Sequence, residues 1–250
     1  KKVALALGGY TDLELRLQKN IFHRLMKLMR EIDFSLSAKI LVYSPNVVKD
    51  WGLVKYRDKI AIAHEHFLDF NTFKTRKPFS ERANLVGYVG RLSEEKGVLN
   101  LVEAVPRITG AEKDFRLVLA GEGHLRGQIE EFIDKAGLDH HVSLAGWISH
   151  DQVPAYLNDF RLLVLPSYTE GLPNVMLEAM ACGTPVLATA VGSISQFISD
   201  GQTGYIMENN SPECIAGNIL RALRDPDLKR VGLSGQALVK EKFTFEEAVK

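Results

Sequence analysis

From residue 84 onward, apolar and polar positions predict a regular succession of strands and helices. Short apolar runs predict strands at 84–89, 115–120, 142–145, 161–165, 185–190 and 204–207. Helical periodicity and end signals predict helices at 96–108, 124–136, 152–158, 174–182, 195–199, 212–224 and 227–241. Because strands this apolar are buried on both faces, helices must cover both sides of the sheet. We therefore expect residues 84–250 to form an α/β domain with a Rossmann-like, doubly wound parallel sheet.

Residues 1–83 carry a shorter version of the same pattern. Strands are expected at 3–7, 39–43 and 59–63, with a helix at 13–32, and this order predicts a parallel sheet. The helix has an expected core face at Leu13, Leu17, Ile21, Leu25, Leu28 and Ile32. Five basic residues on the helix would also suit peripheral contact with an anionic membrane surface. Residues 74–82 read as an exposed linker.

Charge and composition narrow the classes of protein. The chain has 250 residues, 46% of them hydrophobic, which is ordinary for a globular protein. Its 31 basic and 31 acidic residues cancel, so net charge gives no support to nucleic-acid binding. Two distant cysteines indicate a reduced compartment, and no apolar run approaches the roughly 20 residues that span a bilayer. We expect a cytoplasmic protein, at most in contact with the cytoplasmic membrane face.

The first candidate site lies in the loop and helix that follow the strand at 161–165. Asn174 is the expected N-cap of the helix, and Gly183 its stop signal. Glu170 in the loop and Glu178 in the helix would both lie near the helix mouth, where α/β sheets bind phosphates and hydroxyls. The alternative is that Glu178 only complements the helix dipole and that Glu170 is a solvated loop residue.

The second candidate site is the loop after the first strand of this domain. Gly90 ends the strand, and Arg91 and Lys96 flank a loop that enters a helix. An arginine fork can hold a phosphate bidentately, and a lysine adds a mobile charge. Both residues could instead be solvated cations. Their position at the carboxyl end of a strand favours ligand binding, because such sheets bind ligands at that edge.

Three further features are weaker candidates for a functional site. His64 and His66 lie two residues apart with Asp69 close behind, but zinc needs three or four ligands, so a polar strand end is the preferred interpretation and no metal is expected. Cys182 lacks an adjacent base and is expected to be a buried side chain. Trp147 follows a strand at the binding edge, where it could flank a base pocket or belong to the core.

The glycines of residues 121–127 are similar to a dinucleotide-binding fingerprint with one extra residue before the third glycine. The first strand of the domain lacks this pattern, and no acidic residue clearly ends the next strand to hold a ribose. Hydride transfer is therefore a minor alternative.

The segment from Glu170 to Val186 resembles the signature of retaining glycosyltransferase family 4, in which two glutamates lie eight positions apart, here Glu170 and Glu178. Gly90-Arg91 and Lys96-Gly97 match the family's diphosphate-binding pair. The resemblance implies a GT-B fold and a metal-independent transferase that uses a nucleotide sugar such as a UDP- or GDP-sugar, without a further cofactor.

The same resemblance implies roles for the site residues. Arg91, Lys96 and amides beginning at Gly171 would hold the diphosphate, and Glu178 would bind ribose hydroxyls. Glu170 would hold the donor sugar together with the backbone of Gly171, Leu172, Pro173 and Asn174. The acceptor would be a saccharide, a lipid or a small molecule.

The resemblance covers residues 84–250, whereas residues 1–83 match only the last portion of the family's N-terminal domain. The chain is therefore expected to be a fragment or to lack residues. Two other kinds of function remain open. One is a nucleotide-sugar binding module without catalysis; the other is a nucleotide-sugar epimerase or a phosphorylase on the same architecture.

Overall fold

The computed structural model describes residues 4–6, 23–42, 48–49, 51–62 and 68–244. In its N-terminal part, three short strands form a parallel sheet in the order β1-β2-β3. The elements there are β1 (Ala4–Ala6), α2 (His23–Leu36), β2 (Lys39–Val42), η1 (Leu53–Lys59) and β3 (Ile60–Ile62). The three predicted strands and their parallel pairing are confirmed. Most of the predicted helix at 13–32 lies outside the described residues, and its described part continues to Leu36.

The core of this small sheet differs from the predicted one. Phe34, Ile40, Val42 and Leu53 are buried together. Leu28 and Ile32, which were expected on the core face of the helix, are 59% and 49% exposed, so that prediction is wrong. The helix has apolar residues on more than one face, and periodicity alone does not tell which of them meets the sheet.

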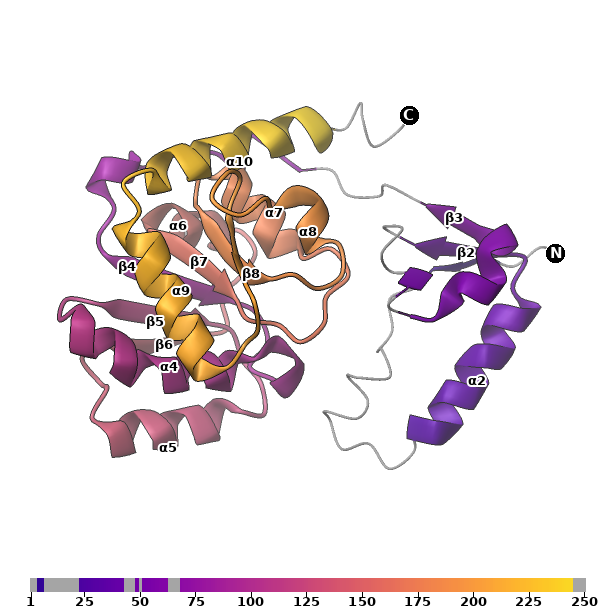
Figure 1. The fold of residues 1–250 in the computed structure, drawn as a ribbon, viewed down its shortest axis with the longest axis horizontal. Coiled ribbons are helices and arrows are strands. Elements are labelled where there is room, and N and C mark those ends of the chain that lie inside the picture. The colour runs from indigo at the N-terminus through magenta and orange to yellow at the C-terminus, as the bar shows by residue number, and fades with distance from the viewer. Residues whose placement is uncertain (1–3, 7–22, 43–47, 50, 63–67, 245–250) are drawn as a thin grey trace.

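The larger part of the chain contains a six-stranded sheet in the order β6-β5-β4-β7-β8-β9. Every neighbouring pair of its strands is parallel. Its strands are β4 (Leu85–Val89), β5 (Arg116–Ala120), β6 (Val142–Gly146), β7 (Leu162–Leu165), β8 (Val186–Thr189) and β9 (Tyr205–Met207). Its helices are η2 (Phe79–Glu81), η3 (Glu94–Lys96), α4 (Val98–Ala111), α5 (Arg126–Ala136), α6 (Val153–Asp159), α7 (Asn174–Ala181), α8 (Ile194–Phe197), α9 (Pro212–Arg224) and α10 (Leu228–Lys242). The predicted α/β, doubly wound, Rossmann-like fold is confirmed (Figure 1).

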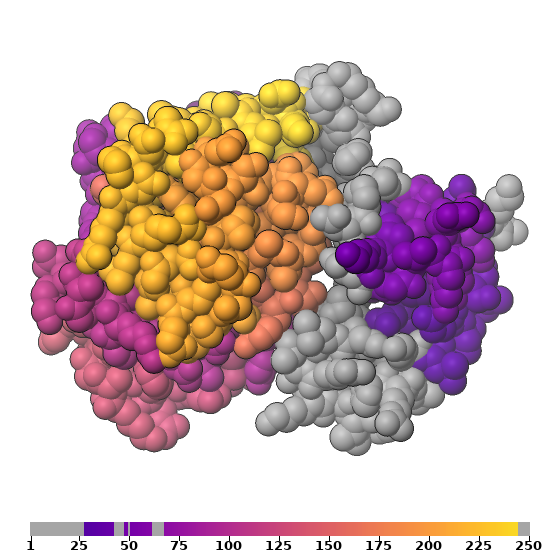
Figure 2. Space-filling model, viewed as in Figure 1, coloured from indigo at the N-terminus to yellow at the C-terminus, as the bar shows by residue number. Residues whose placement is uncertain are grey.

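Helices cover both faces of this sheet, and each face has its own apolar core. One core joins α4, α5 and α9 to the strands through side chains such as Val86 and Tyr88. The other joins α6, α7 and α8 to the opposite face through side chains such as Leu163 and Leu165. Alternation along each strand sends successive side chains to opposite cores, as in β7, where Leu162 and Val164 belong to the first core. In Figure 2 the side chains of α9 and α10, at the yellow end of the scale, hide the strands behind them.

The strand order identifies where a ligand would bind. The order in which strands are added to the sheet changes side between β4 and β7, because β5 and β6 lie on one side of β4, and β7, β8 and β9 on the other. At such a switch point the loops that leave the carboxyl ends of the two central strands diverge, and a crevice opens between them. The loops at 90–97 and 166–173, which carry both candidate sites, leave these two strands.

The segment before β4 is only partly an exposed linker. Arg82 is 4% exposed, which contradicts the prediction at this residue. Its guanidinium donates to the carbonyl oxygens of Phe160 at 3.0 Å and Cys182 at 2.9 Å, and to Thr184 Oγ1 at 2.6 Å. A basic residue in a polar stretch carries no local signal for burial, because these three partners lie 78 to 102 positions further along the chain. Arg82 thus ties the segment to the larger sheet.

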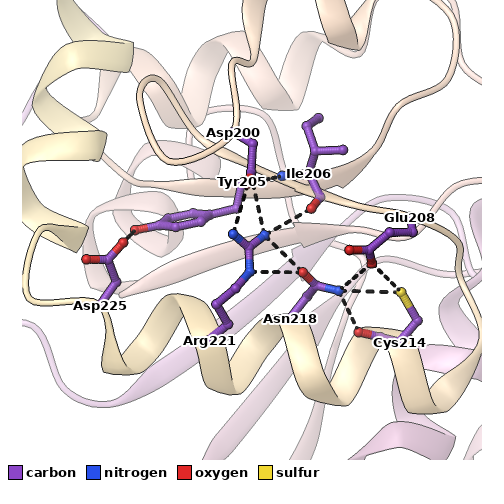
Figure 3. A network of polar contacts seen from close by, with 8 residues as sticks. All are labelled: Asp200, Tyr205, Ile206, Glu208, Cys214, Asn218, Arg221 and Asp225. Atoms are coloured by element: carbon purple, nitrogen blue, oxygen red, sulfur yellow. Dashed lines mark hydrogen bonds and ion pairs between the residues drawn. The ribbon is translucent and has the colours of Figure 1, made fainter.

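A polar network fastens α9 to the edge strand β9 (Figure 3). Arg221 donates to both carboxylate oxygens of Asp200, at 3.0 and 2.9 Å, and its guanidinium stacks over the Tyr205 ring at 5.3 Å. It also donates to the Ile206 carbonyl oxygen, while Asn218 joins the network to Glu208 at 3.0 Å. The bidentate pairing fixes α9 in register with the last strand.

Candidate functional site

The loops that leave β4 and β7 approach each other through glycine. Gly97 has φ 64°, and a Cβ atom there would lie 2.1 Å from the carbonyl oxygen of Pro166. Only a residue without a side chain allows this approach. Gly97 also separates the short turn η3 from α4, so the helix begins at Val98 and not at residue 96 as predicted. Lys96 therefore lies at the end of η3, facing the β7 loop.

Lys96 and Glu170 form the central ion pair of the site. Lys96 Nζ donates to both carboxylate oxygens of Glu170, at 2.8 Å each. The two side chains are only 21% and 10% exposed, so the pair is well shielded from solvent. Ser167 Oγ donates to Glu170 Oε1 at 2.7 Å. The structure thus joins two predicted site residues that lie 74 positions apart in the chain.

Ser167 is a member of this site that the sequence analysis missed. Its hydroxyl has the right position because Thr189 Oγ1 donates to the Ser167 carbonyl oxygen at 2.5 Å, which ties the end of β8 to the β7 loop. A small polar residue two positions after a buried strand and three before Glu170 was the signal that could have identified it.

The loop after β8 supports the backbone around Gly171. Ser193 N donates to the Gly171 carbonyl oxygen at 2.9 Å. Gly192 has φ 57°, and a Cβ atom there would lie 2.0 Å from the Glu170 carbonyl oxygen. This glycine is therefore required by a close backbone approach, and the β8 loop fixes the height of the β7 loop above the sheet.

Helix α7 begins at Asn174, as the predicted range 174–182 has it, but its N-cap lies one residue before the predicted one. Pro173 is the N-cap and Asn174 is the first helical residue, without a side-chain hydrogen bond to the helix end. Pro173 is extended, with ψ 117°, and so takes the boundary position that the sequence assigned to Asn174. Asn174 is exposed, Gly171 and Leu172 are half-buried, and Pro173 is buried.

Glu178 lies in α7 and pairs with a residue from another loop. Its carboxylate Oε1 is 3.1 Å from Nε2 of His150, which follows β6. The His150 ring in turn packs edge-on against Phe73 at 5.3 Å. Burial raises the pKa of Glu178, and the hydrogen bond from His150 acts in the opposite direction. His150 was not predicted, since nothing in its neighbourhood of the sequence connects it with α7.

Arg91 lies in the same loop as Lys96 but has a different partner. Its Nη2 atom is 3.4 Å from Oε1 of Glu95, and 56% of the Arg91 side chain is exposed. Tyr88 OH donates to the Arg91 carbonyl oxygen at 2.5 Å. Burial, and then the charges of Glu170 and Glu95, raise the pKa of Tyr88, so its hydroxyl stays protonated as a donor. Gly90 precedes Arg91, and the backbone of Gly121 approaches it closely because Gly121 has no Cβ, which would lie 1.8 Å from the Gly90 carbonyl oxygen.

The weaker candidates have different outcomes. Trp147 is 73% exposed, so core packing is wrong for it. Cys182 is fully buried as predicted, and burial raises the pKa of its thiol to about 12. His64 and His66 lie outside the described residues, and Asp69 caps a turn by accepting from Thr72 Oγ1 at 2.6 Å. Within the described ranges no cluster of three or more metal-ligating side chains occurs, and no helix is long and apolar enough to cross a bilayer.

Comparisons with known proteins find a family model and relatives that match most of the chain. The family model described as "Glycosyl transferases group 1" matches residues 69–234. Alpha-D-kanosaminyltransferase of Streptomyces kanamyceticus is 33% identical over 193 residues, which is 75% of this chain and 50% of that protein. The chain thus spans about half the length of this curated relative.

Solved structures agree with the fold. The C-terminal domain of the glycosyl transferase group 1 family protein LpcC from Francisella tularensis has a TM-score of 0.65 at 25% identity, covering 71% of this chain and 99% of that one. Anabaena Alr3699/HepE, solved in complex with UDP and glucose, has a TM-score of 0.80 at 18% identity, covering 99% and 69%. At that identity the second likeness concerns the fold alone, which is of the expected GT-B type.

Proposed function

Since the chain belongs to the glycosyl transferases group 1 family, we propose that it transfers a sugar from a nucleotide-sugar donor to a hydroxyl acceptor. The observation that carries the proposal is the Lys96–Glu170 pair, which links the two loops at the switch point of the sheet. We further propose family 4 chemistry, with retention of configuration and without a metal or an additional cofactor. Arg91 and Lys96 would supply the positive charge that a metal provides elsewhere.

The leaving diphosphate is the part of the reaction that the site is best suited to stabilise. Negative charge grows on it as the glycosidic bond breaks. Fixed cations and amides already aimed at that position stabilise the transition state more than the bound donor. Arg91, Lys96 and the amides from Gly171 onward would do so. Lysine has three N–H donors, so Lys96 can keep a bond to Glu170 while it donates to a phosphate oxygen.

Glu170 would then have two tasks. It holds Lys96 in place, as the two 2.8 Å bonds indicate, and its oxygens can accept from hydroxyls of the donor sugar. The backbone of Leu172, Pro173 and Asn174 would line the same sugar. The Ser167 hydroxyl fixes the rotamer of Glu170 for both tasks.

Glu178 would accept hydrogen bonds from the ribose hydroxyls. Its burial, with 8% of its surface exposed, lets only a ligand that reaches into the crevice contact the carboxylate. A ribose would compete with or join His150 at Glu178 Oε1. Trp147, exposed beside the same edge, would flank the base.

The relatives support a nucleotide sugar as the donor, but they do not identify the acceptor. One is named for kanosaminyl transfer, and one neighbour of the same fold was solved with UDP and glucose. We propose a saccharide, lipid or small-molecule acceptor, with the enzyme in the cytoplasm or at the cytoplasmic face of the membrane. We propose that the transferred sugar is a hexose.

Calorimetric titration of the chain with UDP-, GDP- and ADP-glucose, with and without magnesium, tests the donor site. One nucleotide class should bind, and magnesium should leave its affinity unchanged. Lys96→Ala and Arg91→Ala should each weaken binding by roughly tenfold or more, as expected for one lost charge-assisted hydrogen bond.

Lys135→Ala is the matched control, because Lys135 is an exposed lysine that pairs with Glu131 within α5. It should bind the donor as the wild type does. Equal affinity of the Lys96→Ala variant and the wild type would contradict the proposed site. A product assay with the bound donor then separates transfer from mere binding, and conversion of the donor without an acceptor would indicate an epimerase.

A further inference from the structure

Glu95 is a fully buried carboxylate in the loop that carries both cations of the site. None of its side-chain surface is exposed, whereas its neighbours Glu94 and Lys96 keep 38% and 21%. Burial of a carboxylate is unfavourable unless cations or hydrogen-bond donors compensate for the lost water. An acidic residue in this position therefore calls for a specific partner.

The two carboxylate oxygens of Glu95 differ in their contacts. Oε1 accepts a hydrogen bond from Ser93 Oγ at 2.7 Å and lies 3.4 Å from Arg91 Nη2. Oε2 is buried and has no hydrogen-bond partner among the described residues. A carboxylate that served only to hold the loop together would be expected to satisfy both oxygens. The one charged group that Glu95 faces at short range in the described structure is Arg91.

The arrangement fixes Arg91 at both ends. At the backbone of Arg91, Tyr88 OH donates to the Arg91 carbonyl oxygen at 2.5 Å. The backbone of Glu95 is held separately, because Tyr168 N donates to the Glu95 carbonyl oxygen at 2.9 Å. At its side chain, Glu95 lies opposite the guanidinium. The 3.4 Å separation is that of an ion pair and exceeds the roughly 2.7–2.9 Å of a charge-assisted hydrogen bond, so Glu95 attracts the guanidinium by its charge.

We propose that Glu95 is a positioning residue for Arg91, which it holds where the diphosphate of the donor binds. This inference rests on the proposed function and assigns a residue outside the two predicted motif pairs. Glu95 does not touch the substrate, because its side chain is fully buried. It acts through the guanidinium, which is 56% exposed and accessible to a ligand.

The test uses Glu95→Gln, which keeps the shape of the side chain and removes its charge. We would measure unfolding and the affinity for UDP, GDP and ADP, in the wild type and in the Glu95→Gln, Arg91→Ala and doubly substituted chains. Thermal stability should stay equal or rise, because a buried charge is lost. Affinity for the diphosphate should fall by roughly tenfold, and the double variant should bind no worse than Arg91→Ala alone.

Glu94→Gln is the control, as Glu94 is the adjacent, partly exposed glutamate that pairs with His124. It should bind the diphosphate as the wild type does. The inference is overturned if Glu95→Gln binds normally while Arg91→Ala does not, or if the two losses add in full. If the wild type binds none of the three diphosphates, the proposed function itself fails and this inference falls with it.

Discussion

Glu178, the proposed ribose-binding residue, is a buried carboxylate that lowers the stability of the fold at neutral pH. Burial raises the pKa of Glu178 above its ordinary value of 4.5. A raised pKa means that the stability contributed by the protonated carboxyl is fully present below the ordinary value and is lost as pH rises through the raised pKa. At neutral pH the folded protein therefore carries the cost of a buried carboxylate.

We predict that Glu178→Gln unfolds at a higher temperature than the wild type at pH 7 and that this advantage disappears on acidification below pH 4.5. The amide resembles the protonated acid and can still accept a hydrogen bond from His150. Scanning calorimetry at a series of pH values measures the difference. Glu131→Gln, at an exposed glutamate of α5 whose pKa is lowered by Lys135, should show no such gain. A gain for Glu178→Gln that is the same at all pH values would argue against burial of the charge as its cause.

Gly192 and Gly201 provide a test of how the loops of the site are supported. Both have positive φ, at 57° and 69°. A Cβ at Gly192 would meet the Glu170 carbonyl oxygen at 2.0 Å, whereas one at Gly201 would meet nothing within 4 Å. The two residues therefore share the same backbone constraint and differ only in the close approach.

We predict that Gly201→Ala costs about 1 kcal/mol of stability through left-handed backbone strain alone. Gly192→Ala should cost more and should also weaken donor binding, because the β7 loop with Glu170 must move. Denaturant unfolding and calorimetric titration of the two variants would be compared. Equal effects on both stability and binding would show that the β8 loop does not determine the position of Glu170.

The α9 network gives a second prediction about a structural element. Arg221 forms a bidentate pair with Asp200 and also donates to the Ile206 carbonyl oxygen. Because lysine lacks the planar guanidinium fork, Arg221→Lys should lower the free energy of unfolding by about 1 kcal/mol. The loss is modest because the ion pair is partly exposed. Arg230→Lys, at an exposed arginine that pairs with Asp227, the N-cap residue of α10, should lose little stability. Donor binding should be unchanged in both, which separates this network from the site.

Local sequence patterns were sufficient to predict the helices and strands but not the contacts between them. The predicted strands agree with the observed ones to within about one residue, because each is a short apolar run in a chain with little other β-forming sequence. The burial of Arg82 and the exposure of Leu28 depend on segments far away in the chain and left no trace in the pattern. The N-cap of α7 is Pro173 and not Asn174, because the extended conformation of Pro173 takes the boundary position, which a list of favoured capping residues does not capture.

For the site, sequence and structure contributed different parts. The motifs supplied Arg91, Lys96, Glu170 and Glu178, and the fold places the first three on adjoining loops. Their partners Ser167, Glu95 and His150 were missed. Glu95 directly precedes Lys96, and Ser167 lies three positions before Glu170, so both belong to the loops that carry the motifs. His150 lies in the loop after β6, and only the fold connects it with Glu178.

In the whole molecule, the proposed donor site lies at the carboxyl edge of the larger sheet. The division into residues 1–83 and 84–250 remains a prediction, although the family match from residue 69 and the contacts of Arg82 attach part of the connecting segment to the larger sheet. The opposite, amino edge has a groove whose lining includes Lys113, Asp114 and Arg116, and its two cations make it an alternative place for an anionic ligand.

A crystal structure of the chain soaked with the nucleoside diphosphate that binds most tightly distinguishes these two edges. We predict density for the diphosphate within hydrogen-bonding distance of Lys96 and Arg91, with the ribose against Glu178. Density in the groove beside Lys113 and Arg116, or a ribose turned away from Glu178, would contradict the account.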